Sequence, residues 1–313
     1  SNSFKTATKY LPNFYAAYYN HAIVQKKMGN LKDAVSNYEK VIEIKPDYAE
    51  AHNNLGTLLI DLDKLDSSRK RYEKAIEIKP DFAEAYNNLG NLFKNLGKLE
   101  EAVVNFEKAR NLNPNFAEAH FNHGTALIEL GEITSAIKSF NEALSFRPDY
   151  AQAHNNLGNA YKQSGNLSAA IKSYEKAISN KDNYAEAQNN LGLAFMNLGI
   201  LDSAAVHLKI ALKIKPNYIF ANNNYGSLLS QLGKFTESIN YYQNALSVDP
   251  NFFEAYSNLG NSFKYLKRHD ESLESYEKSY EINPEAKYSL GSIVHSKLHL
   301  SKWNHLNKQI KNS

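Results

Sequence analysis

The sequence predicts an all-α repeat fold, a right-handed superhelix of about eight helical hairpins with further helices at its ends. Two observations predict it. First, an Asn stands just ahead of Leu-Gly, or a close equivalent, every 34 residues along a chain of 313 residues. Second, the apolar residues of each repeat follow helical spacing and are interrupted by Gly and Pro. Such a period indicates a one-dimensional stack in which each repeat contacts its neighbours.

Other positions keep the same period of 34 residues. Two residues after the Asn comes a Gly, with Ala22 in the first repeat: Gly56, Gly90, Gly124, Gly158, Gly192, Gly226 and Gly260. Sixteen residues later comes a large apolar residue: Tyr38, Tyr72, Phe106, Phe140, Tyr174, Leu208, Tyr242 and Tyr276. A Pro closes most repeats: Pro46, Pro80, Pro114, Pro148, Pro216, Pro250 and Pro284.

The third repeat illustrates how these positions predict a hairpin. Residues 83–96 carry apolar residues on one helical face, and Gly97 supplies the turn. A second helix follows with Phe106 on its inner face, flanked by small residues where two helices cross. Pro114 ends the repeat, and we expect the Asp or Asn that follows such a Pro to cap the next helix.

These hairpins resemble tetratricopeptide repeats over roughly residues 12–286. The pattern of apolar-Gly, aromatic, Ala, aromatic, Ala and Pro is met in repeats two to eight. The first repeat departs from it at His21-Ala22, and Asp63 and Lys267 replace the turn Gly in repeats two and eight. The resemblance implies that the first helices of successive hairpins line a concave inner wall. It says little about the partner, because one fold hosts many functions.

The domain organisation follows from the repeat. Residues 1–11, with Phe4 at the aromatic site, are expected to be the second helix of a preceding repeat whose first helix is missing. We therefore expect the chain to come from a longer array. Residues 12–286 are expected to form eight repeats, and residues 287–313 a C-terminal capping or connecting helix with the only Trp, Trp303.

That C-terminal segment also resembles the junction in O-linked N-acetylglucosamine transferase and SPINDLY-type glycosyltransferases. The resemblance is carried by Asn-Leu-Gly in nearly every repeat and by the stretch from His295 to Trp303. It implies that a catalytic region follows the array and that the present chain is the non-catalytic, recruiting part. The alternative is a terminal capping helix that contains a Trp.

The recurring Asn is the candidate binding residue. With each repeat numbered from the residue five before this Asn (Ala83 in the third), it is position 6 and shares a helix face with positions 2, 5, 9, 12 and 13. A carboxamide both donates and accepts, so a row of them can hold the main chain of an extended peptide. In the glycosyltransferases this row has that role by resemblance. The eight candidates are Asn20, Asn54, Asn88, Asn122, Asn156, Asn190, Asn224 and Asn258.

The asparagines have an alternative role, and two lysines are further candidates for binding. The Asn side chains could instead bond to a neighbouring helix or to water in the groove. Lys94 and Lys162, at position 12, are expected to point into the same groove and to engage acidic side chains or a terminal carboxylate. Ile60 and Ile128 separate the lysines of this position, so the sequence predicts only a weak clamp.

The composition argues against nucleic acids and membranes as partners and leaves proteins. The charge of +3, from 36 basic and 33 acidic residues interleaved along the helices, gives no basis for nucleic-acid binding. No apolar run is long enough to span a membrane. Absence of cysteine favours a cytoplasmic location. The sequence thus predicts binding of proteins or disordered peptide segments, the alternative being a scaffold that self-associates through its truncated ends.

No catalytic, metal or cofactor site is predicted. His52, His120 and His154 occupy position 4, where an aromatic residue usually packs, and are expected to be packing residues. Gly97-Lys98 lacks the spacing and the Ser or Thr of a phosphate-binding loop. No nucleophile stands with a base in a recognisable pattern, so we expect the chain not to be an enzyme.

Overall fold

A computed structural model describes residues 14–285, 291–298 and 300, and over these residues the chain is helical without strands. Residues 291–298 are helical as well. The first helices of the hairpins are α2 (Tyr15–Lys27), α4 (Ala49–Asp61), α6 (Ala83–Asn95), α8 (Ala117–Glu129), α10 (Ala151–Gln163), α12 (Ala185–Asn197), α14 (Ile219–Gln231) and α16 (Phe253–Tyr265). The second helices are α3 (Leu31–Ile44), α5 (Leu65–Ile78), α7 (Leu99–Leu112), α9 (Ile133–Phe146), α11 (Leu167–Asn180), α13 (Leu201–Ile214), α15 (Phe235–Val248) and α17 (His269–Ile282).

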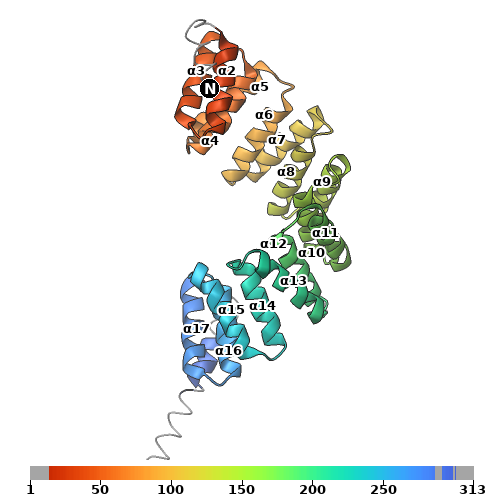
Figure 1. The fold of residues 1–313 in the computed structure, drawn as a ribbon, viewed down its shortest axis with the longest axis vertical. Coiled ribbons are helices and arrows are strands. Elements are labelled where there is room, and N and C mark those ends of the chain that lie inside the picture. Colours follow the sequence, from red (N-terminus) through yellow and green to blue (C-terminus); the bar gives the residue numbers. More distant parts are fainter. Residues whose placement is uncertain (1–13, 286–290, 299, 301–313) are drawn as a thin grey trace, which may run out of the picture. The chain divides into compact units, whose positions relative to one another are not determined.

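Consecutive helices pair as hairpins, as the period predicted (Figure 1). The chain divides into two compact units, one ending at Ala160 and the other beginning at Tyr161. Hairpins α2/α3, α4/α5, α6/α7 and α8/α9 lie in the first unit, and hairpins α12/α13, α14/α15 and α16/α17 in the second. The all-α fold of stacked hairpins is therefore confirmed within each unit.

Most hairpins close by placing a ring against a glycine. Phe106 of α7 is fully buried on Gly90 of α6, where an added Cβ would lie 2.7 Å from the ring. Leu208 fills the corresponding space over Gly192. Glycine at this position thus sets the distance between the two helices, which is the physical reason for its recurrence.

The turn between the two helices requires a left-handed residue. Gly97 has φ of +72°, and the N–H groups of Gly97 and Lys98 donate to the carbonyl oxygens of Lys94 and Phe93 at 3.0 and 2.9 Å. Where the sequence lacks the glycine, the same conformation persists: Asp63 has φ of +56° and Lys267 has φ of +60°. A side chain with a Cβ is strained there.

Replacing Lys267 with glycine is expected to raise the free energy of unfolding by about 0.5 kcal/mol. Relief of about 1 kcal/mol of left-handed strain is partly offset by the greater freedom of glycine in the unfolded chain. The reverse change, Gly97→Lys, serves as the matched control and should lower stability by a similar amount. Chemical denaturation of both variants measures the effect, and a loss of stability in Lys267→Gly would contradict it.

The predicted helix caps are wrong. The Asp or Asn after each Pro lies in the turn, and an aromatic residue takes the N-cap position instead: Phe14, Tyr48, Phe82, Phe116, Tyr184, Tyr218 and Phe252. None of these provides a side-chain cap. Phe82 is buried among Ala49, Ala75 and Ala85, so packing against adjacent helices decides where α6 begins. A side-chain cap does occur at α11, where Asn166 accepts from the N–H of Ala169 at 3.1 Å.

The predictions for the ends fall largely outside the described residues. Residues 1–11, including Phe4, and Trp303 lie there, as does most of the predicted segment 287–313. The truncated repeat, the eight-repeat boundary of 12–286 and the terminal helix remain proposals.

Candidate functional site

The position-6 asparagines all lie on the first helices, but the structure does not present them equally. Asn20 is exposed and Asn122 is buried. The other six are partly exposed: Asn54, Asn88, Asn156, Asn190, Asn224 and Asn258. The sequence predicted one uniform row, whereas the depth of each amide depends on the side chains that surround it.

A hydrogen bond links most of these asparagines to the preceding first helix. The Nδ2 of Asn88 donates to the Oδ1 of Asn53, at position 5 of α4, at 3.0 Å. The same bond recurs at 2.9–3.0 Å from Asn122 to Asn87, from Asn224 to Asn189 and from Asn258 to Asn223. The alternative of bonding to a neighbouring helix is therefore realised for part of each amide. We call these asparagines and their position-5 partners the amide row.

The position-5 residue decides whether the bond forms. In α2 that residue is Tyr19, whose hydroxyl accepts from Asn54 at 2.8 Å. In α8 it is Phe121, which offers no acceptor, and Asn156 makes no hydrogen bond to α8. The oxygen of Asn156 accepts only from its neighbour Asn155, at 3.4 Å. Among the asparagines, only those at position 6 were predicted to bind, although Asn also recurs at position 5, 35 residues before the Asn of the next repeat.

In two members of the amide row the interhelical bond leaves half of the amide unused. Asn88 and Asn224 each donate one N–H to the preceding helix, and no other bond of theirs is formed within the described residues. Each side chain retains a second N–H and a carbonyl oxygen. Since both are partly exposed, each presents one donor and one acceptor in an orientation fixed by the interhelical bond.

The two candidate lysines differ from one another. Lys94 lies 4.0 Å from Glu129 of α8, a partly exposed ion pair that contributes little to stability. Burial lowers the pKa of Lys162, and no described carboxylate lies within ion-pair distance of it. An acidic partner group would therefore meet an already paired cation at Lys94 and an unpaired one at Lys162.

The position-4 histidines bond to main-chain carbonyl groups. The Nε2 atoms of His52, His120 and His154 donate to the oxygens of Pro46, Pro114 and Pro148 at 3.0, 2.8 and 2.9 Å. Each bond ties the start of a first helix to the end of the preceding repeat. Within the described ranges, no group of three or more His, Asp or Glu side chains is placed to hold a metal ion.

A serine–histidine pair lies inside the α8/α9 hairpin. His123 Nδ1 is 2.9 Å from the Oγ of Ser139, and burial, with the charge of Arg110, lowers the pKa of His123 to about 4. Ser139 donates its only proton to the carbonyl oxygen of Ser135, so the ring must donate to the serine. A base that activates a serine has to accept its proton. The geometry of this pair is therefore that of a packing contact.

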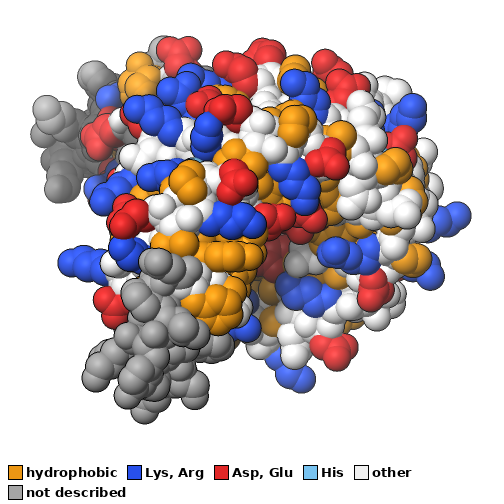
Figure 2. Space-filling view, turned by 90° about the horizontal axis from the view of Figure 1, so that it is seen from above, with side chains coloured by type: hydrophobic (Ala, Val, Ile, Leu, Met, Phe, Trp, Pro, Cys, Tyr) orange, Lys and Arg blue, Asp and Glu red, His pale blue; other side chains and the backbone are white. Residues whose placement is uncertain are grey.

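Charge is dispersed over the face of the molecule that Figure 2 shows. Figure 2 shows Lys and Arg side chains interspersed with Asp and Glu over the described atoms of the face in view. Among the described residues, no helix has the length and apolar character that crossing a membrane requires.

Comparison with known proteins identifies the repeat. The TPR repeat profile matches residues 26–62, 56–97, 124–165, 158–199 and 226–264, and the Tetratricopeptide repeat profile matches residues 83–116 and 253–286. The chain belongs to the tetratricopeptide repeat family. No curated protein matches it. Membership of the tetratricopeptide repeat family supports a protein-interaction module with protein partners.

Solved structures show the same fold. The chain is 16% identical to one in the crystal structure of the APC/C hetero-tetramer Cut9-Hcn1, with a TM-score of 0.67, over 91% of this chain and 56% of that one. It therefore spans just over half of that chain's length. It is also 16% identical to a tetratricopeptide repeat protein from Parabacteroides merdae, with a TM-score of 0.65, over 80% of this chain and 98% of the other.

Proposed function

We propose that this tetratricopeptide array binds extended, partly disordered polypeptides along its first helices, and that the amide row holds their main chain. One observation carries the proposal. In Asn88 and Asn224 the interhelical Asn–Asn bond fixes the carboxamide, and the second N–H and the carbonyl oxygen make no other bond among the described residues. A peptide unit also has one donor and one acceptor, so such an amide can grip it without reading its sequence.

The spacing of the row suits an extended chain. Packed helices lie about 10 Å apart, whereas an extended peptide advances about 3.3 Å per residue. Successive amides would therefore meet about every third residue of a bound segment. Since the contacts are to the main chain, the intervening side chains remain free to contribute specificity.

The proposal predicts different effects for the two members of one bonded pair. Asn88→Ala should weaken binding about tenfold, because it removes a donor and an acceptor worth about 1.5 kcal/mol in total. Asn53→Ala removes the acceptor that orients Asn88 and a long contact of 3.5 Å from its Nδ2 to Asn54, but no group that we expect to meet the peptide, and should therefore retain most of the affinity. The measurement is fluorescence anisotropy with an uncharged, unstructured peptide of glycine, serine and asparagine.

The pair also serves as its own control for stability. Both substitutions break the same interhelical bond and should lower the free energy of unfolding by a similar amount, about 1 kcal/mol. Asn156→Ala, which breaks no bond to the preceding helix, should weaken binding with little change in stability. Equal affinities for Asn88→Ala and Asn53→Ala would assign the row a purely structural role.

Recruitment of substrates for a linked glycosyltransferase stays a prediction. It rests on the sequence resemblance alone, and Trp303, on which that resemblance partly depends, lies outside the described residues. Catalytic activity, cytoplasmic location and self-association through Phe4 likewise remain as the sequence predicted them. We assign the binding role to the amide row, with Lys162 as the cation available to an acidic group nearby.

A further inference from the structure

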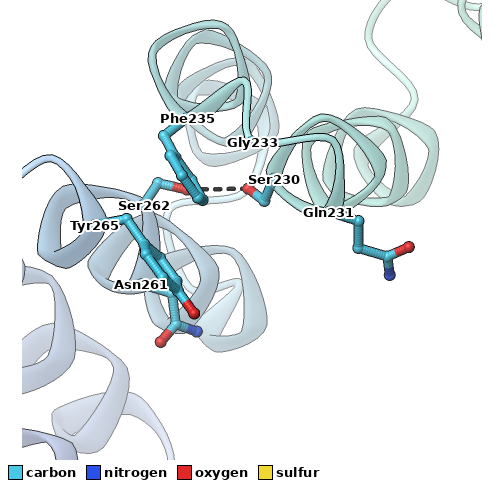
Figure 3. A pocket seen from close by; sticks show the side chains of 7 residues that line it. All are labelled: Ser230, Gln231, Gly233, Phe235, Asn261, Ser262 and Tyr265. Carbon is cyan, nitrogen blue, oxygen red and sulfur yellow. Dashed lines mark hydrogen bonds between the residues drawn. The ribbon is translucent and has the colours of Figure 1, made fainter.

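A pocket of about 560 Å³ opens where α14 turns into α15 and meets the end of α16. Seven residues line it, and none of them is charged: Ser230, Gln231, Gly233, Phe235, Asn261, Ser262 and Tyr265 (Figure 3). The pocket lies wholly within the second compact unit.

Three departures from the repeat pattern create this pocket. Position 12 is Ser230 in the seventh repeat, whereas it is Lys, Ile or Met in the others. Position 10 is Ser262 in the eighth repeat, whereas it is Leu or Ala in repeats two to seven. The short side chain of Ser230 leaves space that Lys, Ile or Met fills in the other repeats, and Ser262 supplies a hydroxyl group where repeats two to seven have none. Position 13 is Asn, Asp, Gln, Glu or Lys in the other repeats and becomes Tyr265 here.

Aromatic rings form one wall. Phe235 and Tyr265 stack with ring centroids 4.5 Å apart and an interplanar angle of 6°. Tyr265 is nevertheless 69% exposed, so the described residues leave much of its ring uncovered. A large ring held in a fixed orientation and left exposed provides a stacking surface for another planar group.

A chain of hydroxyl groups forms the floor, and proton accounting fixes its direction. Ser238 donates to the carbonyl oxygen of Phe235 at 2.8 Å, so it must accept from Ser262, 2.9 Å away. Ser262 has then used its only proton and must accept from Ser230 at 3.1 Å. Ser230 in turn accepts from the hydroxyl of Tyr242 at 3.2 Å.

Ser230 therefore offers the pocket an acceptor and no donor. Its proton is committed to Ser262, while one of its two lone pairs remains after the bond from Tyr242. A group that fits this wall and floor is planar, uncharged and carries a hydrogen-bond donor. Among protein side chains, the indole of tryptophan and the phenol of tyrosine meet all three conditions.

The pocket adjoins the amide row. Asn258, Asn261 and Tyr265 follow one another at i, i+3 and i+7 on one face of α16. Asn258 also donates to the Oγ of Ser227 at 3.4 Å, and Ser227 lies one turn before Ser230 on α14. Tyr265 lies about 10 Å along the helix from Asn258, so a polypeptide held at Asn258 would place a side chain at the pocket within about three residues.

We propose that this pocket binds a tryptophan or tyrosine side chain of the polypeptide partner and so gives the array a sequence preference. The proposal rests on the proposed function, because it assigns the partner's side chain while the amide row holds its main chain. The partner side chain that enters the pocket is expected to be an uncharged aromatic ring with an N–H or O–H donor.

Fluorescence anisotropy with four peptides tests the pocket. They share one glycine, serine and asparagine sequence and differ at a central tryptophan, tyrosine, phenylalanine or alanine. The tryptophan peptide should bind about tenfold more tightly than the alanine peptide, with phenylalanine intermediate because it lacks the donor. Ser230→Ile should abolish this preference and leave the alanine peptide unaffected. Ile60 and Ile128 occupy the same position, so the variant should fold.

A second variant, Tyr265→Gln, removes the stacking wall with a residue that Gln163 and Gln231 already provide at that position. It too should lose the preference. Equal binding of the tryptophan and alanine peptides would contradict the binding of an aromatic side chain in the pocket, but not the binding of the main chain by the amide row. If no peptide binds, an NMR titration with N-acetyltryptophanamide tests the pocket alone. Shifts of the Tyr265 ring resonances that are lost in Ser230→Ile would support the pocket. No shift in the parent protein would overturn it.

Discussion

Replacing Phe106 with alanine is expected to lower the free energy of unfolding of the α6/α7 hairpin by about 4 kcal/mol. The ring is fully buried and fills the space that Gly90 leaves between the two helices. Glycine and alanine together would leave a cavity there, because neighbouring hairpins hold the helices apart. Hydrogen exchange of the α6 and α7 amides measures the loss locally, which matters because repeat arrays need not unfold in one step.

Phe106→Leu is the matched control for this loss. Leucine already occupies the equivalent place as Leu208, where it packs on Gly192 and is fully buried. The substitution should therefore cost about 1 kcal/mol, well below the cost of alanine. Equal losses for the two variants would mean that the size of this side chain does not set the stability of the hairpin.

Lowering the pH is expected to destabilise the first compact unit through His123. Burial lowers the pKa of His123 to about 4, against about 6.5 in the unfolded chain. Between these values the unfolded state binds more protons, so the contribution of His123 is fully present above about pH 6.5 and is lost as the pH falls towards 4. The difference of about 2.5 in pKa corresponds to about 3 kcal/mol.

His123→Leu isolates this effect. Leucine occupies position 7 in most repeats, for example at Leu89 and Leu157, and it has no proton to bind. Chemical denaturation gives the free energy of unfolding at each pH for the parent protein and the variant. Above pH 6.5 the two free energies should depend on pH in the same way. Below pH 6.5 the parent should lose stability relative to the variant. Parallel curves down to pH 4 would show that His123 is protonated equally in the folded and unfolded chain.

The hairpins were predictable because their determinants are local. Helical spacing, the turn glycines and the small residues at position 8 each act within one repeat, and α6 (Ala83–Asn95) ends one residue before the end of the predicted range of 83–96. The caps were not predictable in the same way. Phe82 takes the N-cap of α6 because it packs against Ala49 and Ala75 of the preceding hairpin, a contact that propensity does not describe.

The site depended on contacts between repeats in the same way. A helical wheel places positions 5 and 6 on one face, but it does not show that Asn88 reaches Asn53 of the preceding helix. The pocket is the opposite case. Ser230, Ser262 and Tyr265 each break a pattern that the other repeats keep, so aligning the repeats would have marked them without coordinates.

The most direct test of the amide row is to observe its carboxamide groups while a peptide binds. Nitrogen-15 spectra resolve the side-chain NH₂ groups, and an unstructured glycine, serine and asparagine peptide serves as the ligand. The account predicts that the signals of Asn88, Asn156 and Asn224 shift in proportion to occupancy, while that of the buried Asn87 moves little. Binding of the peptide with the signals of all three unchanged would contradict it.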